Sequence, residues 1–151
     1  MRPQTSIMLI GEYIHSVDDK NRVSLPSKFR KEIGKKVVIT RGLDNCLFLY
    51  PLNQWEKISG KLAELGMAQA DKRGLNRFLL AGASEVDVDS NGRILVPDYL
   101  KQFANLSTKV VFAGVYDRVE LWNDTRWETY KKTIEKQADM FAEKLGDVNS
   151  L

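Results

Sequence analysis

One ten-residue pattern occurs twice in this chain, and the two copies are separated by a constant 71 residues. The first copy, residues 17–26, reads VDDKNRVSLP, and the second, residues 88–97, reads VDSNGRILVP. In each copy an acidic residue ends one apolar segment and an arginine opens the next, with asparagine or Asn-Gly between them. These turn residues tolerate the positive φ that tight hairpins require. Each copy therefore predicts a strand, a tight turn, a second strand and a helix that begins at the proline.

The repeat extends beyond the hairpins, at offsets of 72 or 73 residues. Residues 110–112 match residues 37–39, residues 119–122 match residues 47–50, and Trp127 matches Trp55. Each repeat thus reads β-β-α-β-β followed by a longer helix, which predicts an α+β fold. One such unit buries too little apolar surface to be stable alone. We therefore expect the two units to share one core with pseudo-twofold symmetry, an arrangement that interlocked hairpins would allow.

This pattern divides the chain into five segments. The expected limits are residues 1–8 for an N-terminal arm, 9–54 for the first repeat, 55–82 for linker helices, 83–126 for the second repeat, and 127–151 for a C-terminal helix and tail. Apolar stripes at helical spacing run from Trp55 to Leu65 and from Trp127 to Leu145. Such stripes are most often buried in their own chain, so we expect a cover for the core; an interface between subunits is the second interpretation.

Composition excludes several classes of protein. No apolar run approaches the length of a membrane span, and no signal peptide is visible. Cys46 is the only cysteine and His15 the only histidine, so the chain has no internal disulfide and too few ligands for a Cys/His zinc site. We find no nucleophile–base pair, phosphate loop or carboxylate cluster, and expect no catalytic residues, no cofactor, no metal, no small-molecule substrate and no membrane association. A reducing, cytoplasmic compartment fits the single cysteine.

Positive charge is concentrated in the first repeat. The net charge is +3, and residues 1–44 contribute +4 whereas residues 83–130 contribute −3. The first repeat is therefore the better candidate for contact with a polyanion.

The arginines of the two hairpins are the candidate DNA contacts. A guanidinium on a rigid turn can pair bidentately with guanine or with a phosphate, and a two-stranded ribbon fits the major groove of B-DNA. The predicted DNA-binding residues are Arg22, Lys20, Asn21, Lys28 and Arg30 in the first repeat, and Arg93 and Asn91 in the second. Asp18 and Asp89 are expected to hold the arginines in place. The alternative interpretation is a weak salt bridge within each turn; the acidic neighbours of Arg93 suggest that the second hairpin is partly structural.

The paired hairpins resemble the MraZ family of bacterial transcription regulators. The resemblance rests on both Asp-x-x-x-Arg hairpins, on residues 11–13, 22–26, 46–51 and 92–97, and on Glu120-Leu121-Trp122 followed by Trp127. It implies a tandem AbrB-like swapped-hairpin β-barrel with flanking helices, ring-shaped homo-oligomers, and binding to repeated boxes upstream of the division and cell wall gene cluster, including the chain's own promoter. It also implies association with the nucleoid. The family's DNA-contacting arginine falls on Arg22, with Arg93 as its equivalent, and Asn21 stands where the family usually has glycine.

A second function remains open. AbrB-like barrels also serve as antitoxins that bind a partner protein through a disordered C-terminal arm. Here the C-terminus is patterned as a helix, which favours the DNA-binding interpretation. Repression and activation are both compatible with the sequence.

Overall fold

The computed structural model describes residues 7–65 and 67–146 of the 151-residue chain. The elements are, in chain order, β1 (Leu9–Ser16), β2 (Arg22–Ser24), α1 (Ser27–Ile33), β3 (Lys36–Arg41), β4 (Leu47–Pro51), α2 (Leu52–Ala63), α3 (Ala70–Asn76), the π-helical turn η1 (Arg77–Ala81), β5 (Ser84–Asp87), β6 (Arg93–Leu95), α4 (Asp98–Phe103), β7 (Lys109–Tyr116), β8 (Val119–Asn123) and α5 (Asp124–Leu145). This order contains the predicted β-β-α-β-β pattern twice. Most of the predicted N-terminal arm and tail, residues 1–6 and 147–151, lies outside the described residues.

Prolines set the junctions between strands and helices. Pro26, Pro51 and Pro97 are the N-cap residues of α1, α2 and α4, with φ between −54° and −56° and extended ψ. The helical backbone begins one residue later than the sequence predicts. Because the ring fixes φ, the chain turns sharply from strand to helix, and this keeps α1 and α4 close to the hairpins.

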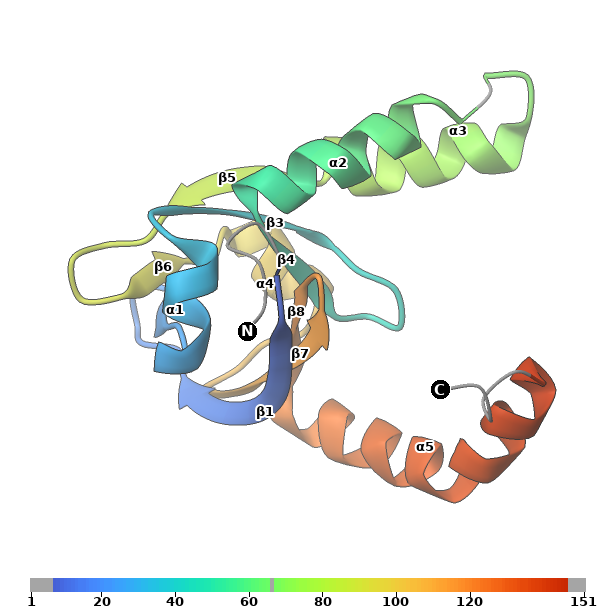
Figure 1. Cartoon of the computed structure of the whole chain (residues 1–151). Helices are drawn as coiled ribbons and strands as arrows, with labels where there is room; N and C mark the ends of the chain where they lie inside the picture. Colours follow the sequence, from blue (N-terminus) through green and yellow to red (C-terminus); the bar gives the residue numbers. More distant parts are fainter. Residues whose placement is uncertain (1–6, 66, 147–151) are drawn as a thin grey trace.

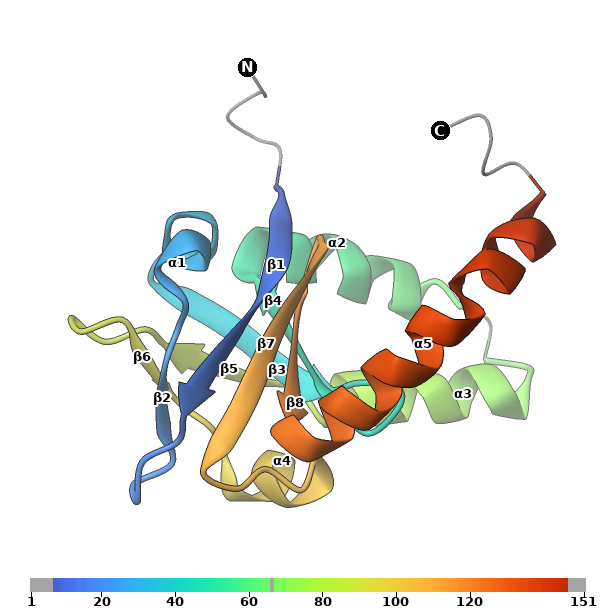
Figure 2. The same cartoon turned by 90° about the horizontal axis from the view of Figure 1, so that it is seen from below.

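The strands form a six-stranded antiparallel sheet and a separate two-stranded ribbon (Figure 2). The sheet has the order β1-β7-β8-β4-β3-β5, and the ribbon pairs β2 with β6. The first strand of each repeat pairs with a strand of the other repeat, β1 with β7 and β5 with β3. The equivalent strands of the two repeats are β1 and β5, β2 and β6, β3 and β7, and β4 and β8. If each strand is exchanged with its equivalent, the set of pairings stays the same, as the predicted pseudo-twofold symmetry requires.

The described strands do not close into the predicted barrel. The sheet ends at β1 and β5. The ribbon meets these edges next to the hairpin turns, where the N–H of Asp18 donates to the oxygen of Arg22 and that of Asp89 to the oxygen of Arg93, both at 2.9 Å, and where Val17 forms an isolated bridge with Val23. The ribbon strands are three residues long and lead directly into the segment before a proline. Since proline has no N–H for a ladder, the pairing with the edge strands cannot continue and an open sheet results.

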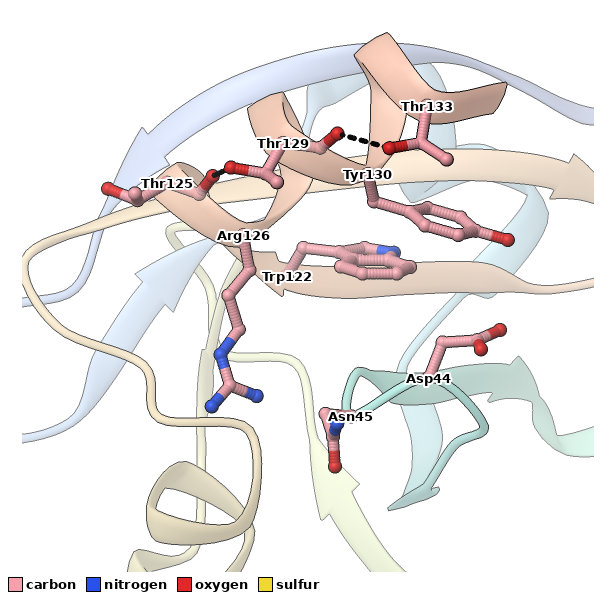
Figure 3. Close-up of a pocket in the computed structure, with 8 residues that line it drawn as sticks. All are labelled: Asp44, Asn45, Trp122, Thr125, Arg126, Thr129, Tyr130 and Thr133. Carbon is pink, nitrogen blue, oxygen red and sulfur yellow. Dashed lines mark hydrogen bonds between the residues drawn. The ribbon is translucent and has the colours of Figure 1, made fainter. Parts of the chain in front are cut away.

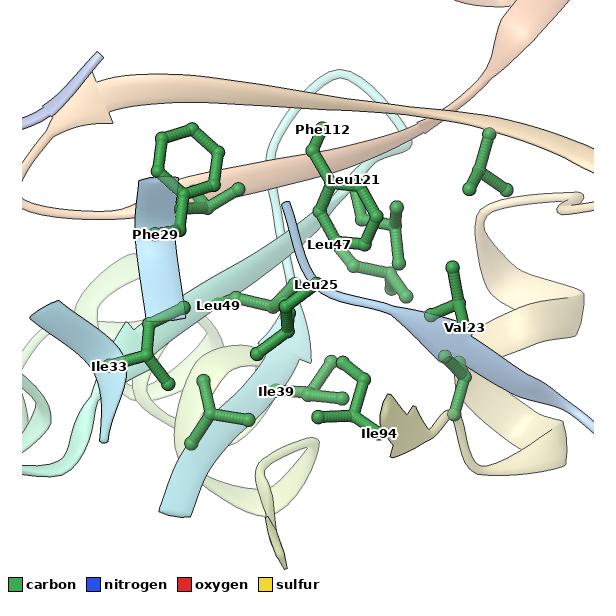
Figure 4. Packing of buried hydrophobic residues seen from close by; sticks show 14 of the residues in the cluster. Val23, Leu25, Phe29, Ile33, Ile39, Leu47, Leu49, Ile94, Phe112 and Leu121 are labelled. Atoms are coloured by element: carbon green, nitrogen blue, oxygen red, sulfur yellow. The ribbon is translucent and has the colours of Figure 1, made fainter. Parts of the chain in front are cut away.

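One core is filled by side chains from both repeats (Figure 4). Leu25 and Phe29 of the first repeat and Ile94 and Phe112 of the second are at most 1% exposed and belong to the same cluster. Burial of one such side chain stabilises the fold by about 1.5–3 kcal/mol. The two repeats therefore share one core, as the sequence predicts.

The long helices extend away from this core (Figure 1). None of the α2 residues described is buried, and in α5 Trp127 is the one described residue that is buried. The predicted cover therefore holds only for the first turns of these helices. Farther along α5, Met140 and Phe141 are each 42% exposed and Leu145 is 74% exposed. None of the described helices combines the length and the apolar composition of a membrane span.

The chain after α2, within the linker predicted over residues 55–82, is not one regular helix. It divides into α3 and η1, and β3 side chains bind the carbonyl groups of the π-helical turn. Thr40 Oγ1 donates to the oxygen of Leu79 at 2.6 Å, and Arg41 Nε donates to that of Phe78 at 3.0 Å. These bonds fix the linker against the sheet.

Candidate nucleic-acid interface

The first hairpin turn is built around the carboxylate of Asp18. Its Oδ1 accepts hydrogen bonds from the backbone N–H of Lys20 at 2.9 Å and of Arg22 at 2.8 Å. The pKa of Asp18 is lowered, chiefly by the hydrogen bond from the Arg22 backbone and also by the charges of Arg22 and Arg93. The carboxylate is thus ionised at neutral pH and fixes the backbone on which the arginine stands.

The second turn has the same geometry. Asp89 Oδ1 accepts from the N–H groups of Asn91 and Arg93, both at 2.9 Å. Gly92 has φ +77°, and Asn21 has φ +62° at the equivalent position of the first turn. Asparagine is one of the few residues with a side chain that enters this region readily, so both turns close in the same way.

The β2–β6 ribbon brings the two arginines onto one face. Arg22 pairs with Leu95 and Ser24 pairs with Arg93, whereas Val23 and Ile94 face the core and are each 1% exposed. In this register the two arginines are diagonal neighbours, about 7–8 Å apart at the backbone. Both line a shallow cavity of about 260 Å³. The two candidate sites of the sequence therefore form one surface, which we call the arginine ribbon and define as the outer face of β2 and β6.

The two arginines differ in their partners. Arg93 Nε donates to Asp89 Oδ2 at 3.0 Å. Among the described residues, the guanidinium of Arg22 makes no hydrogen bond or ion pair, and Arg22 is partly exposed. Asp87 lies near Arg93 but is paired with Lys36 at 3.4 Å. Of the two ribbon arginines, Arg22 is therefore the more available to a ligand.

The other predicted contacts divide into two groups. Lys20, Lys28 and Asn91 are exposed, so their side chains are accessible to a phosphate backbone. Arg30 and Asn21 are only partly exposed and are engaged within the protein.

Arg30 binds the backbone of its own repeat just after β2, and Asn21 binds side chains of the other repeat. Arg30 donates to the carbonyl oxygen of Leu25, and Asn21 is hydrogen-bonded to Asp98 and Lys101 of α4. Sequence reasoning missed Asp98 and Lys101 as members of the site. The repeat offset could have identified Lys101, because Lys101 lies 71 residues after the predicted contact Arg30.

Other candidate residues for a functional site are Cys46, His15 and the potential metal ligands. The described residues contain no group of three or more His, Cys, Asp or Glu side chains placed to hold a metal ion. Cys46 is fully buried, and burial raises the pKa of its thiol. Burial, with the charge of Arg30, lowers the pKa of His15, which packs edge-on against Phe112.

A second cavity lies where α5 leaves the sheet (Figure 3). It has a volume of about 420 Å³, and Tyr130 stacks on Trp122 in its wall with ring centroids 5.2 Å apart. Thr129 and Thr133 donate their hydroxyl groups to α5 carbonyl oxygens. One carboxylate, Asp44, and one guanidinium, Arg126, line the cavity. In Figures 1 and 2, α5 and the β2–β6 ribbon lie on opposite sides of the sheet.

The fold and the site define a class: a double-repeat α+β protein that presents guanidinium groups on a two-stranded ribbon, as β-ribbon readers of DNA do. A family model described as "MraZ protein, putative antitoxin-like" matches residues 8–78 and 79–147. The chain belongs to the MraZ family. Curated relatives named "Transcriptional regulator MraZ" include proteins of Caldanaerobacter subterraneus subsp. tengcongensis, 46% identical over 94% of this chain and 99% of that protein, and of Acetivibrio thermocellus, 47% identical over 91% and 96%. A third, from Moorella thermoacetica, is 46% identical over 93% and 98%.

Proposed function

We propose that this chain is a sequence-specific DNA-binding transcriptional regulator whose arginine ribbon enters the major groove. The observation that carries the proposal is the placement of Arg22 and Arg93 on one exposed face of the ribbon. The names of the relatives support the regulatory role.

The dimensions of the ribbon agree with this role. A two-stranded ribbon fits the major groove, and a guanidinium can donate two hydrogen bonds to guanine O6 and N7. The spacing of about 7–8 Å between the arginine backbones spans roughly two base-pair steps. One subunit therefore reads a short stretch of sequence with both repeats, rather than two separate sites.

The individual residues then take different roles. Arg22 makes the principal base contact, because its guanidinium has no partner among the described residues; Arg93 makes a second contact while Asp89 holds it. Lys20, Lys28 and Asn91 bind the phosphate backbone. Arg30 and Asn21 contribute by fixing the turns.

Assembly and target complete the proposal. We propose that copies of the chain form a ring-shaped homo-oligomer and bind repeated boxes upstream of the division and cell wall gene cluster, its own promoter included, in the cytoplasm at the nucleoid. Simultaneous contact with several boxes raises apparent affinity by roughly 10²–10⁴. The exchange of β1 and β5 between repeats supports the swapped-hairpin description of each unit. The domain limits of residues 9–54 and 83–126 stay predictions.

A second candidate is an antitoxin-type interaction module. The exposed apolar side chains of Met140 and Phe141 on α5 favour it, as does the antitoxin-like description of the family. A stoichiometric partner that co-purifies after nuclease treatment, together with loss of that partner on Phe141→Glu, would support this candidate over the first.

The test of the leading proposal is the substitution Arg22→Ala, with binding measured by fluorescence anisotropy on a duplex from the region upstream of the coding sequence. Loss of a bidentate base contact should weaken specific binding by about 1–3 kcal/mol per engaged subunit. Arg126→Ala is the charge-matched control, since Arg126 is exposed at the cavity on the opposite side. Equal binding by wild type and Arg22→Ala would show that the ribbon is not the DNA contact.

A further inference from the structure

Each hairpin turn is held by a basic residue from the helix of the other repeat. Arg30 in α1 and Lys101 in α4 occupy equivalent positions, 71 residues apart. Arg30 donates from Nε to the carbonyl oxygen of Leu25 at 3.0 Å, and its guanidinium lies against Gly92. Lys101 donates from Nζ to Oδ1 of Asn21 at 2.8 Å. The two contacts are topologically equivalent but chemically different.

The contact at the first turn uses both ends of the Asn21 amide. Asn21 Nδ2 donates to Asp98 Oδ1 at 2.5 Å, while Lys101 donates to the amide oxygen. A carboxylate only accepts and an ammonium only donates, so a single orientation of the amide satisfies both partners. The backbone oxygen of Asn21 also accepts from Val96 N–H at 2.8 Å. The residue before Arg22 is thus fixed through its side chain and its backbone.

We propose that Lys101 and Asp98 are positioning residues of the DNA-binding surface, which lock the Asn21 turn and thereby set the direction of Arg22. The inference rests on the proposed function of the arginine ribbon. Arg22 follows Asn21 directly, so a shift of the turn displaces the start of β2. The second turn needs no such lock, because Gly92 has no side chain and Arg30 packs on its backbone.

The competing role for Lys101 is a direct phosphate contact, and the two roles differ in their response to salt. Binding of the full chain to a labelled duplex from its upstream region is measured for Lys101→Met, Asn21→Gly and the double variant. We expect Lys101→Met, which loses one hydrogen bond, to bind about two- to tenfold more weakly. Asn21→Gly also loses the hydrogen bond to Asp98 and should bind at least as weakly. The double variant should bind DNA no more weakly than the single variant with the lower affinity, because each substitution already removes the Lys101–Asn21 hydrogen bond.

In Lys101→Met, the slope of log binding affinity against log salt concentration should equal that of the wild type. Loss of a phosphate contact would reduce the slope by about 0.9, whereas loss of a hydrogen bond within the protein would not change it. A reduced slope for Lys101→Met, additive losses in the double variant, or wild-type affinity would each overturn the positioning role. Lys101→Arg keeps a donor at this position and should restore most of the affinity.

Hydrogen exchange tests the lock without DNA. In Lys101→Met, amides of residues 18–23 should exchange faster at short labelling times, whereas those of residues 89–94 should not change. The second turn is the internal control, because it has no contact with Lys101 in the structure. Equal exchange rates in the wild type and in Lys101→Met would refute the lock. Failure of the proposed function would show in a different experiment, because Arg22→Ala would then bind DNA as tightly as the wild type.

Discussion

The substitution Gly92→Ala probes the contact between the second turn and α1. Gly92 has φ +77°, and a Cβ atom there would lie 2.5 Å from Nε of Arg30. The left-handed backbone costs a residue with a side chain about 1–2 kcal/mol. Displacement of the guanidinium also breaks its hydrogen bond to Leu25, which contributes about 1 kcal/mol. We therefore expect the free energy of unfolding to fall by about 2–3 kcal/mol.

Urea denaturation followed by tryptophan fluorescence, at one fixed protein concentration, measures this loss. The control is the same substitution in an Arg30→Ala background, where no guanidinium remains to be displaced. Gly92→Ala should then cost about 1 kcal/mol less than it does in the wild type, because only the backbone strain is left. An equal cost in both backgrounds would contradict the proposed packing of Arg30 on the turn.

Two further predictions concern stability. A Cβ atom at Gly114 would lie 2.7 Å from the backbone of β1, so Gly114→Ala should destabilise the fold by about 1–3 kcal/mol. Gly60 lies in open space on α2, so Gly60→Ala should stabilise the fold by about 0.5–1 kcal/mol. If urea denaturation gave the reverse order of stability, the β1–β7 packing would be refuted. The pKa values of Asp18 and Asp89 are lowered by backbone hydrogen bonds, so their contribution is complete above the ordinary value of 3.8 and is lost as the pH falls through the folded-state pKa. Melting temperatures of Asp18→Ala and Asp89→Ala should lie below that of the wild type at pH 7 and converge with it in acid; a difference that persists or grows in acid would contradict this.

The hairpins could be predicted from the sequence because their determinants are local. Asp18 and Asp89 bind backbone groups two and four residues away, and Asn21 and Gly92 supply the positive φ. All of these interactions fall within five residues of chain. The duplicated spacing therefore predicts two turns of one geometry, and the structure has them.

The pairing of β2 with β6 could not be predicted in the same way. Two strands of equal pattern can pair within or between repeats, and the choice depends on the shared burial of Val23 and Ile94. The open sheet likewise depends on where β2 and β6 end, each after three residues and shortly before a proline.

The roles of Arg30 and of the long helices show a second limit of sequence patterns. A basic residue on a helix next to a hairpin suggests a phosphate contact. In the structure, however, the Arg30 guanidinium donates to the carbonyl oxygen of Leu25 and packs against Gly92. Helical periodicity identifies the apolar stripe of α5, yet it does not identify the surface that covers it, and most of that stripe is exposed in the single chain.

The most direct test of the arginine ribbon is DNA cleavage by an iron–EDTA chelate tethered to Leu95→Cys. Leu95 is 52% exposed on the ribbon opposite Arg22, and the native Cys46 is fully buried, so the introduced cysteine takes the label. Thr133→Cys, at the cavity on α5, carries the same chelate as the control. We predict cleavage confined to the bound boxes from position 95 and none from position 133. Cleavage from position 133 alone would place the DNA on the other side of the molecule and contradict the account.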